Sequence, residues 1–434
     1  MLIQRLRANS GDLLWVTAGQ GLAFVGALVG IKLLTHLLGP EGYGRLALAL
    51  TISGAFNLLI YGPLGQGVLR HYTIYHEQRT LGRYLAILSR IHQGALSIVL
   101  VTGGAILFLV PKGSESGWWG VVGLAVGLTV VTGWYTSFNA FRLAMKARRV
   151  VAIHQAGDAW LRTLIAVAAV ALLWHAPEAA LAGYLLGTTV VVFSHLLLAR
   201  RNPELAGMIK DRRTAVPTPE DYRSFLRYAG GFTLLAVPAI LSTYADRWVL
   251  QSLFGEYEVG LYAALLQIAV APITLMISVL NQFLLPVIYQ KAGDMTSPEQ
   301  DRESYRVLCI AILGFGTACL PVVLSCFAFG PRIVTFFTTV EFARHADVLW
   351  VLTAATALFW VGQLLAMRAE CHRQPGMIFV PKLIHGVLFV TLALVMAPTY
   401  GINGVAMAYA AASTVYIGAI LITNRQLVRQ LHRT

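Results

Sequence analysis

The sequence predicts an all-α integral membrane protein with about twelve transmembrane helices, arranged as two six-helix lobes related by a pseudo-twofold repeat. Three observations predict this class. Hydrophobic residues make up 57% of the 434 residues, about 247 in all, and each membrane-spanning helix needs ~20 of them. Charged residues make up only 12%, about half of the ~25% that is usual in soluble domains. The third observation is an internal repeat.

The repeat divides the chain into two similar halves. Residues 37–47, LLGPEGYGRLA, recur in degenerate form and without a gap as LFGEYEVGLYA at 253–263, so that position 39 matches position 255. Each copy lies between two long apolar runs, which makes the repeated unit a pair of membrane helices joined by a turn. Glycine permits a tight turn and a close approach of helices. The glycines predicted as hinge or turn residues are Gly39, Gly44, Gly255 and Gly260. Membrane proteins built from two such halves are mostly transporters.

Six apolar runs predict the helices of the first half. The first run follows Arg5 and Arg7, exceeds the ~7–15 apolar residues of a signal-peptide core and lacks a clear cleavage site, so we expect a retained helix. The six runs lie at 13–35, 44–66, 85–110, 118–141, 150–174 and 181–199. Pairs of glycines four residues apart in this half predict close helix packing in lipid. They are Gly26 and Gly30, Gly123 and Gly127, and Gly183 and Gly187.

Six further runs predict the second half, at 228–252, 260–285, 305–328, 346–368, 378–397 and 403–423. With the N-terminus inside, most of the 33 Lys and Arg residues fall at the cytoplasmic ends of these twelve helices, as the positive-inside rule requires. Both termini are therefore expected in the cytoplasm. The outer loops are predicted at 36–42, 111–117, 175–180, 253–258, 329–345 and 398–402, and all are too short to form a catalytic domain.

A polar segment at the midpoint separates the two lobes. The sequence thus predicts an N-terminal lobe at 1–199, a cytoplasmic linker at 200–227 and a C-terminal lobe at 228–434. Within the linker, Thr218 as N-cap, Pro219 at the first helical position and Asp221 three residues after the cap predict a short amphipathic surface helix before helix seven. The basic face of the linker could contact anionic headgroups, a solvated linker being the alternative.

Ionisable residues inside the predicted spans are the candidate functional residues, because each costs several kcal/mol in hydrocarbon unless it faces a cavity or a partner. Asp158 and Arg162 lie four residues apart on one face of helix five. A structural ion pair is one interpretation. In the other, Arg162 lines a cavity and Asp158 positions it or titrates with it.

Further cations lie near the outer ends of matching helices, where snorkelling to the interface is the alternative to a functional role. Helix seven carries Asp246 and Arg247, eight residues before the second repeat glycine, and helix one carries Lys32, seven residues before the first. Arg90 in helix three is another candidate.

Several classes of function find no support in the sequence. The formal net charge of +13 sits in short loops of a membrane protein and does not indicate nucleic acid. The glycines at 39–44 follow no strand, so they do not form a phosphate-binding loop. No catalytic motif is present, and the Glu, Cys and His at 370–372 lie together at one helix end without the spacing of a metal site. We expect neither an enzyme nor a cofactor or metal.

These motifs resemble the polysaccharide transporter and O-antigen flippase family, within the superfamily that also holds multidrug and toxic-compound exporters. The resemblance rests on residues 38–44 (LGPEGYG) after helix one, on Asp246-Arg247 followed by residues 260–263 (GLYA), and on the twelve-helix layout, and it spans essentially the whole chain. It implies a V-shaped pair of lobes around a central cavity that opens alternately to each side. The chain lacks the two extra helices typical of peptidoglycan-precursor flippases.

The resemblance implies a flippase that moves a polyprenyl-diphosphate-linked oligosaccharide from the cytoplasmic to the outer leaflet of a bacterial-type inner membrane. The glycan would be an O-antigen, capsule or exopolysaccharide repeat unit. H⁺ or Na⁺ is the expected coupling ion, and membrane lipid and other glycan-assembly proteins, such as a polymerase, are the expected partners. The diphosphate is anionic and suits Arg and Lys in a low-dielectric cavity. The expected substrate-binding residues are Arg162, Arg247, Lys32 and Arg90, with Asp158 and Asp246 as ion-pair or coupling partners.

Two alternatives stay open. An exporter of small cationic drugs would favour carboxylates and aromatic rings over Arg in its cavity. A membrane-embedded glycan polymerase or ligase would need a sizeable external loop, which this sequence does not provide.

Overall fold

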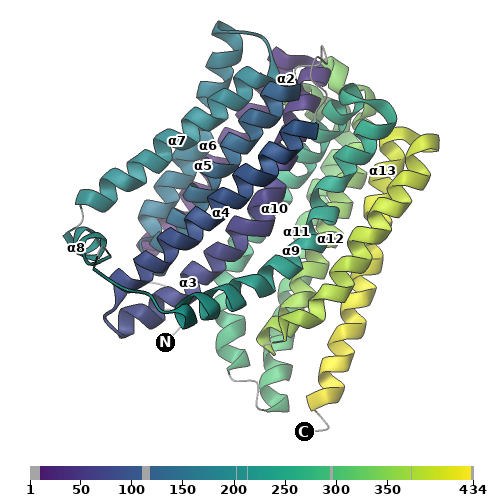
Figure 1. Cartoon of the computed structure of the whole chain (residues 1–434). Coiled ribbons are helices and arrows are strands. Elements are labelled where there is room, and N and C mark those ends of the chain that lie inside the picture. Colours follow the sequence, from purple (N-terminus) through teal and green to yellow (C-terminus); the bar gives the residue numbers. More distant parts are fainter. Residues whose placement is uncertain are drawn as a thin grey trace. The chain divides into compact units, whose positions relative to one another are not determined.

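A computed structural model shows a helical chain, in which the described residues are 10–109, 118–201, 203–212, 214–293, 297–372 and 374–431 and contain no strand. The predicted outer loop at 111–117 and the residues Arg5 and Arg7 lie outside the described residues. The helices of the first half and the midpoint (Figure 1) are α2 (Ser10–Phe56), α3 (Gly62–Glu77), α4 (Leu81–Leu109), α5 (Trp118–Ala144), α6 (Arg148–Leu172), α7 (Pro177–Arg201) and α8 (Pro203–Asp211). A π-helical turn, Asn57–Tyr61, joins α2 to α3.

The second half continues with long helices. They are α9 (Pro219–Phe254), α10 (Glu256–Ala292), α11 (Pro298–Phe337), α12 (Leu349–Cys371) and α13 (Phe379–Leu431). Short 3₁₀ segments, Val340–Val348 and Pro375–Ile378, precede α12 and α13.

Ten helices in the described part of the chain are long and apolar enough to cross a membrane. Two of them, Trp15–Glu77 and Pro375–Arg429, exceed fifty residues, and each contains one glycine with a positive φ, Gly39 (64°) and Gly401 (57°). Dividing these two helices at their glycines gives, with the other eight, twelve membrane segments. The predicted all-α fold with about twelve transmembrane helices is therefore confirmed.

The predicted linker differs from the observed one. No separate helix follows Thr218, because Pro219 begins α9, which continues to Phe254. The predicted start of the helix is confirmed, because α9 begins at Pro219 and the Thr218 backbone N–H donates to Asp221 Oδ2 at 2.7 Å. Nothing after this cap breaks the helix, and Pro238 is accommodated inside it. The separate short helix is instead α8, which the sequence patterns did not predict.

The connections predicted for the outer face are also more helical than predicted. At 36–42 and 398–402 the chain turns at a single glycine and otherwise stays helical. At 329–345, α11 continues to Phe337 across a kink at Phe329, and a 3₁₀ segment follows from Val340. Apolar run length underestimates these helices because polar residues at their ends also adopt helical conformation.

One compact unit comprises residues 10–30 and 45–237 of the described chain. A core cluster joins α3, α4, α5 and the start of α9 around the fully buried rings of Tyr61, Tyr84 and Phe225. Glycines make room for these rings: a Cβ on Gly133 would lie 2.3 Å from the Tyr61 ring, and a Cβ on Gly67 would lie 2.6 Å from the Phe225 ring. In the same unit, α6 packs extensively on α7.

The second compact unit comprises residues 238–431 together with residues 31–44 of the first half. This division differs from the predicted lobe boundaries at 199 and 228. The reason is the packing of the two repeats on each other. A Cβ added to Gly44 would lie 1.9 Å from the Glu256 carbonyl oxygen, and one added to Gly260 would lie 1.8 Å from the Pro40 carbonyl oxygen. The first repeat is thus packed backbone to backbone against the second.

The four repeat glycines fall into two kinds. Gly39 and Gly255 have positive φ values of 64° and 83°, a backbone conformation that favours glycine. Gly44 and Gly260 instead mark the close approach of two backbones. Each repeat therefore contains one glycine for the turn and one, five residues later, for packing.

Candidate functional site

The Asp158–Arg162 pair lies on α6 in the first unit. Asp158 Oδ2 is 3.8 Å from Arg162 Nε, which is an ion pair without a direct hydrogen bond. Asp158 is buried, and its other oxygen accepts a 2.9 Å hydrogen bond from the Thr188 hydroxyl of α7. The carboxylate is therefore held by α7 as much as by Arg162.

The guanidinium of Arg162 is available to a ligand. Its side chain is 37% exposed, and its guanidinium lies over the Tyr184 ring at 5.3 Å. Among the described residues no hydrogen bond to this guanidinium is found. Gly187 of α7 packs directly on the Arg162 backbone, since a Cβ there would lie 2.7 Å from Arg162 Cα. A fixed backbone with a guanidinium fork available to a ligand is suited to bidentate recognition of an anion.

The Asp246–Arg247 pair near the end of α9, in the second unit, is more fully bonded. Asp246 Oδ2 accepts a 2.9 Å hydrogen bond from the hydroxyl of the buried Tyr262 on α10. Arg247 Nη1 donates to the Thr243 carbonyl at 2.9 Å and lies 3.5 Å from Asp246 Oδ1. The ring of Tyr244 lies 6.0 Å from the Arg247 guanidinium. Its own helix thus holds Arg247, while the carboxylate reaches across to the second repeat.

Replacing Tyr262 by phenylalanine should test the link between Asp246 and α10. The substitution removes one hydrogen bond to a buried carboxylate, and we expect a loss of about 1–2 kcal/mol in stability. The measurement is the thermal midpoint of the detergent-solubilised protein. Tyr257→Phe is the matched control, because the Tyr257 hydroxyl bonds Glu341 at an exposed position in the same unit. Equal midpoints for the two variants would contradict the expected role of Tyr262.

Lys32 and Arg90 make contacts of another kind. Lys32 is exposed, and its Nζ lies over the Phe336 ring at 4.6 Å. Arg90 is also exposed, and it donates to the Tyr222 hydroxyl at 2.9 Å rather than bonding to either member of the Asp158–Arg162 pair. Each of these two cations contacts an aromatic side chain. Within each unit, the structure joins the predicted Asp and Arg as a pair, while the remaining predicted cation contacts an aromatic residue.

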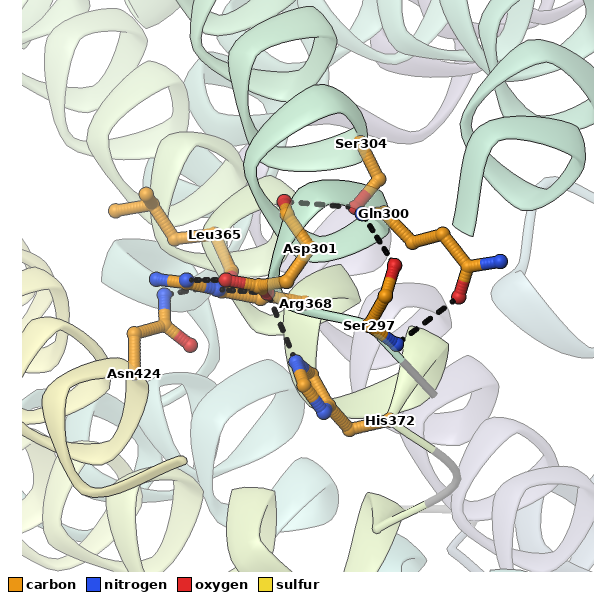
Figure 2. Close-up of polar contacts among 8 residues, drawn as sticks. All are labelled: Ser297, Gln300, Asp301, Ser304, Leu365, Arg368, His372 and Asn424. Atoms are coloured by element: carbon orange, nitrogen blue, oxygen red, sulfur yellow. Dashed lines mark hydrogen bonds and ion pairs between the residues drawn. The ribbon is translucent and has the colours of Figure 1, made fainter. Parts of the chain in front are cut away.

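A further ionic network in the second unit was not predicted as a site (Figure 2). Arg368 of α12 donates through Nε at 2.9 Å and through Nη2 to the two oxygens of Asp301 on α11, and His372 Nε2 donates to Asp301 Oδ1 at 2.9 Å. The Tyr305 ring lies 4.1 Å from the Arg368 guanidinium. The members lie 67 and 71 residues apart, so no local spacing could reveal the network. Both oxygens of Asp301 are bonded within the protein, so we interpret the network as a structural anchor.

The first unit has its own anchor, between α4 and the start of α9. Arg83 Nε donates to Asp221 Oδ2 at 2.7 Å, and the Tyr75 hydroxyl donates to Asp221 Oδ1 at 2.7 Å. The residue that caps α9 therefore also ties this helix to α3 and α4.

The comparisons with known proteins agree with this architecture. Residues 11–291 match the model of a family described as polysaccharide biosynthesis protein. No curated protein matches the chain. Among solved structures, a multidrug resistance MATE family transporter of the MOP superfamily, in an inward-facing conformation, shares 16% identity with a TM-score of 0.70, over 98% of this chain and 95% of that one.

Two other solved structures share the fold. The lipid II flippase MurJ, in an inward closed conformation, has 15% identity and a TM-score of 0.64 over 95% of this chain and 87% of that one. A MOP superfamily transporter from Pyrococcus furiosus has 14% identity and a TM-score of 0.57 over 98% and 96%. Since the family match covers more than half of the chain, the protein belongs to the polysaccharide biosynthesis protein family, and it is a multi-pass membrane protein with the fold of the MOP superfamily transporters.

Proposed function

We propose that the protein is an alternating-access flippase for a polyprenyl-diphosphate-linked oligosaccharide, such as an O-antigen, capsule or exopolysaccharide repeat unit. It would move this lipid from the cytoplasmic to the outer leaflet of a bacterial-type inner membrane, with both of its termini in the cytoplasm. The family membership supports a substrate from polysaccharide biosynthesis. The lipid II flippase among the structures of the same fold supports movement of a lipid-linked glycan.

The observation that carries the proposal is the state of Arg162. A membrane-embedded Arg is expensive unless it is paired or serves a ligand. Asp158 compensates its charge, yet at 3.8 Å it leaves the guanidinium without a direct hydrogen bond. A diphosphate could accept a pair of charge-assisted hydrogen bonds from this fork. Arg247, Lys32 and Arg90 are the further cations we propose for attraction of the diphosphate, with Asp246 as the partner of Arg247.

The test is surface glycan in a deletion strain complemented with Arg162→Ala. We expect the variant to reach the membrane at the wild-type level and to display at least tenfold less glycan, because a lost bond to a charged group is worth about 1.5–3 kcal/mol. Arg162→Lys keeps the charge but not the fork and should give an intermediate level.

The matched control is Arg223→Ala. Arg223 also pairs with a carboxylate on its own helix, Glu220 at 3.7 Å, but both of these side chains are 70% exposed. Its replacement should leave glycan display unchanged. Wild-type display by Arg162→Ala would refute the assignment of Arg162.

Export of small cationic drugs is a second candidate function, and the MATE transporters of the same fold favour it. The observation that supports it is that the two buried carboxylates predicted as site residues lie among tyrosines: Asp246 bonds Tyr262, and Asp158 interacts with Tyr135. Carboxylates and aromatic rings together suit an organic cation. Increased drug susceptibility of the deletion strain, with normal surface glycan, would favour this candidate over the flippase.

A further inference from the structure

A seam of polar residues runs along the contact between α6 and α7. His154, Asp158 and Arg162 recur at intervals of four residues and therefore share one face of α6. Consecutive members lie ~6 Å apart along the helix axis. This face packs on α7. The α7 residues that meet them are, in the same order, His195, Thr188 and Gly187. We call these six residues the α6–α7 seam.

At one end of the seam two imidazoles are stacked. The ring centroids of His154 and His195 lie 3.7 Å apart, with 22° between the ring planes. His195 is 0% exposed, and the Phe138 ring of α5 stacks near it at 5.7 Å. Neither ring nitrogen of His195 has a hydrogen-bond partner among the described residues. Burying a polar ring without hydrogen bonds costs free energy, so His195 would gain hydrogen bonds if the stack opened.

The hydrogen bonds of His154 show where it could take up a proton. Its Nδ1 lies 2.7 Å from the Val150 carbonyl oxygen, and because a carbonyl only accepts, Nδ1 carries the hydrogen. Its Nε2 lies 3.2 Å from the Ser194 hydroxyl, which can donate to a neutral ring or accept from a charged one. His154 Nε2 is therefore an open protonation position of the stack, in addition to the hydrogen-free nitrogen of His195.

The surroundings of the stack are positive. Arg142 of α5 is buried and interacts electrostatically with both imidazoles. The other titratable groups nearby are Tyr135 of α5, with its ring 6.3 Å from that of His195, and Asp158, one turn along the seam. From α2 the uncharged Gln20 bonds Gln155, and among the described residues of α2 and α8 no charged side chain bonds or stacks with either ring. A second cation here would meet repulsion strengthened by the low dielectric.

The second half shows how the same position can be neutralised. Arg142 and Arg368 both lie within three residues of the C-terminal end of the fourth membrane helix of their half, α5 and α12. Arg368 is bonded by both oxygens of Asp301. Among the described residues, Arg142 has no such carboxylate and faces the two imidazoles instead. In the first half, a buried cation therefore lies beside groups that can gain a proton.

We propose that the His154–His195 stack is a proton-binding site, and that binding of a proton separates this end of the α6–α7 seam. The stacked arrangement is the proton-free state, because a charged imidazole would face its neighbour and Arg142. A proton that binds only the separated state shifts the population toward it. Asp158 and Arg162 share the seam, so protonation and anion binding at Arg162 are linked. This inference rests on the proposed function and assigns H⁺, not Na⁺, as its coupling ion.

The test is amide hydrogen exchange of the full-length protein in lipid nanodiscs between pH 8 and pH 5, without substrate and corrected for the intrinsic exchange rate. We expect protection of α6 and α7 to fall as the pH falls, by up to about tenfold per pH unit for one linked proton. Protection of α10 in the second unit should stay constant. His195→Phe keeps an aromatic ring beside Phe138 and should abolish the pH step in α6 and α7.

His92→Phe is the matched control. His92 is buried in the same unit, but its Nδ1 bonds the Leu88 carbonyl and its Nε2 bonds the Ser137 hydroxyl. Among the described residues its ring neighbour is Trp134, and no second histidine stacks on it. This variant should retain the pH step. If His195→Phe does not fold, His154→Phe provides the same comparison, since it also removes one of the two stacked imidazoles.

A flat pH profile of the wild-type protein, or a step that persists without His195, would overturn the proton site. Either result leaves the flippase proposal intact, because the exchange experiment uses no substrate. Wild-type glycan display by Arg162→Ala would count against the proposed function. A pH step measured in the exchange experiment would then still show a proton site, but one without a link to glycan transport. The two failures are therefore distinguishable.

Discussion

Gly260→Ala and Gly44→Ala are each expected to prevent the second unit from packing correctly. The added Cβ would lie 1.8 Å from the Pro40 carbonyl oxygen in the first variant and 1.9 Å from the Glu256 carbonyl oxygen in the second. Backbone atoms cannot rotate away as a side chain can, so the two repeats must separate. We expect a loss of about 3 kcal/mol or more in stability for either variant. Folded yield in the membrane and the thermal midpoint in detergent are the measurements.

The control for this prediction is Gly418→Ala, in α13 of the same unit. A Cβ on Gly418 would meet nothing within 4 Å, and alanine is the better helix former. We expect this variant to be neutral or slightly more stable. Gly255→Ala measures the cost of backbone conformation without a steric clash. A Cβ there would meet nothing within 4 Å, but the φ of 83° disfavours alanine. We expect this variant to lose about 1–2 kcal/mol in stability. If Gly260→Ala is as stable as Gly418→Ala, the two repeats do not pack as the structure shows.

Asp301→Ala is the second substitution for which we expect a large effect. It leaves the buried Arg368 guanidinium without its bidentate partner and deprives His372 of its acceptor. Removing one member of a buried ion pair costs about 3–5 kcal/mol, because the remaining charge keeps its desolvation penalty. We expect a sharp fall in the thermal midpoint and in the amount of folded protein.

Glu303→Ala provides the comparison on the same helix. Glu303 accepts a 2.7 Å bond from Lys291, but both side chains are largely exposed, so the substitution should have little effect. The double variant Asp301→Leu with Arg368→Met should recover part of the loss, since it removes both charges. Similar midpoints for Asp301→Ala and Glu303→Ala would show that the network in Figure 2 does not anchor α11 to α12.

The elements of the fold could be predicted because the bilayer sets their length. A span needs ~20 apolar residues, the composition supplies enough of them for about twelve spans, and twelve apolar runs of about this length occur along the chain. The repeat also indicated the glycines, because the turn glycines Gly39 and Gly255 and the packing glycines Gly44 and Gly260 occupy matching positions. Helical periodicity likewise placed Asp158 beside Arg162, since residues four apart meet on one face.

The sequence alone determined that this is a two-half, twelve-segment membrane protein with charged residues inside its spans. Only the tertiary structure decided which faces meet: Gly44 against the second repeat, Arg368 with Asp301, and His154 stacked on His195. The physical reason lies in the solvent. In water, the apolar face of a helix shows which side is buried, but in lipid both sides are apolar, and close packing and polar contacts choose the partner. Those contacts join residues far apart in the chain, so no local pattern contains them.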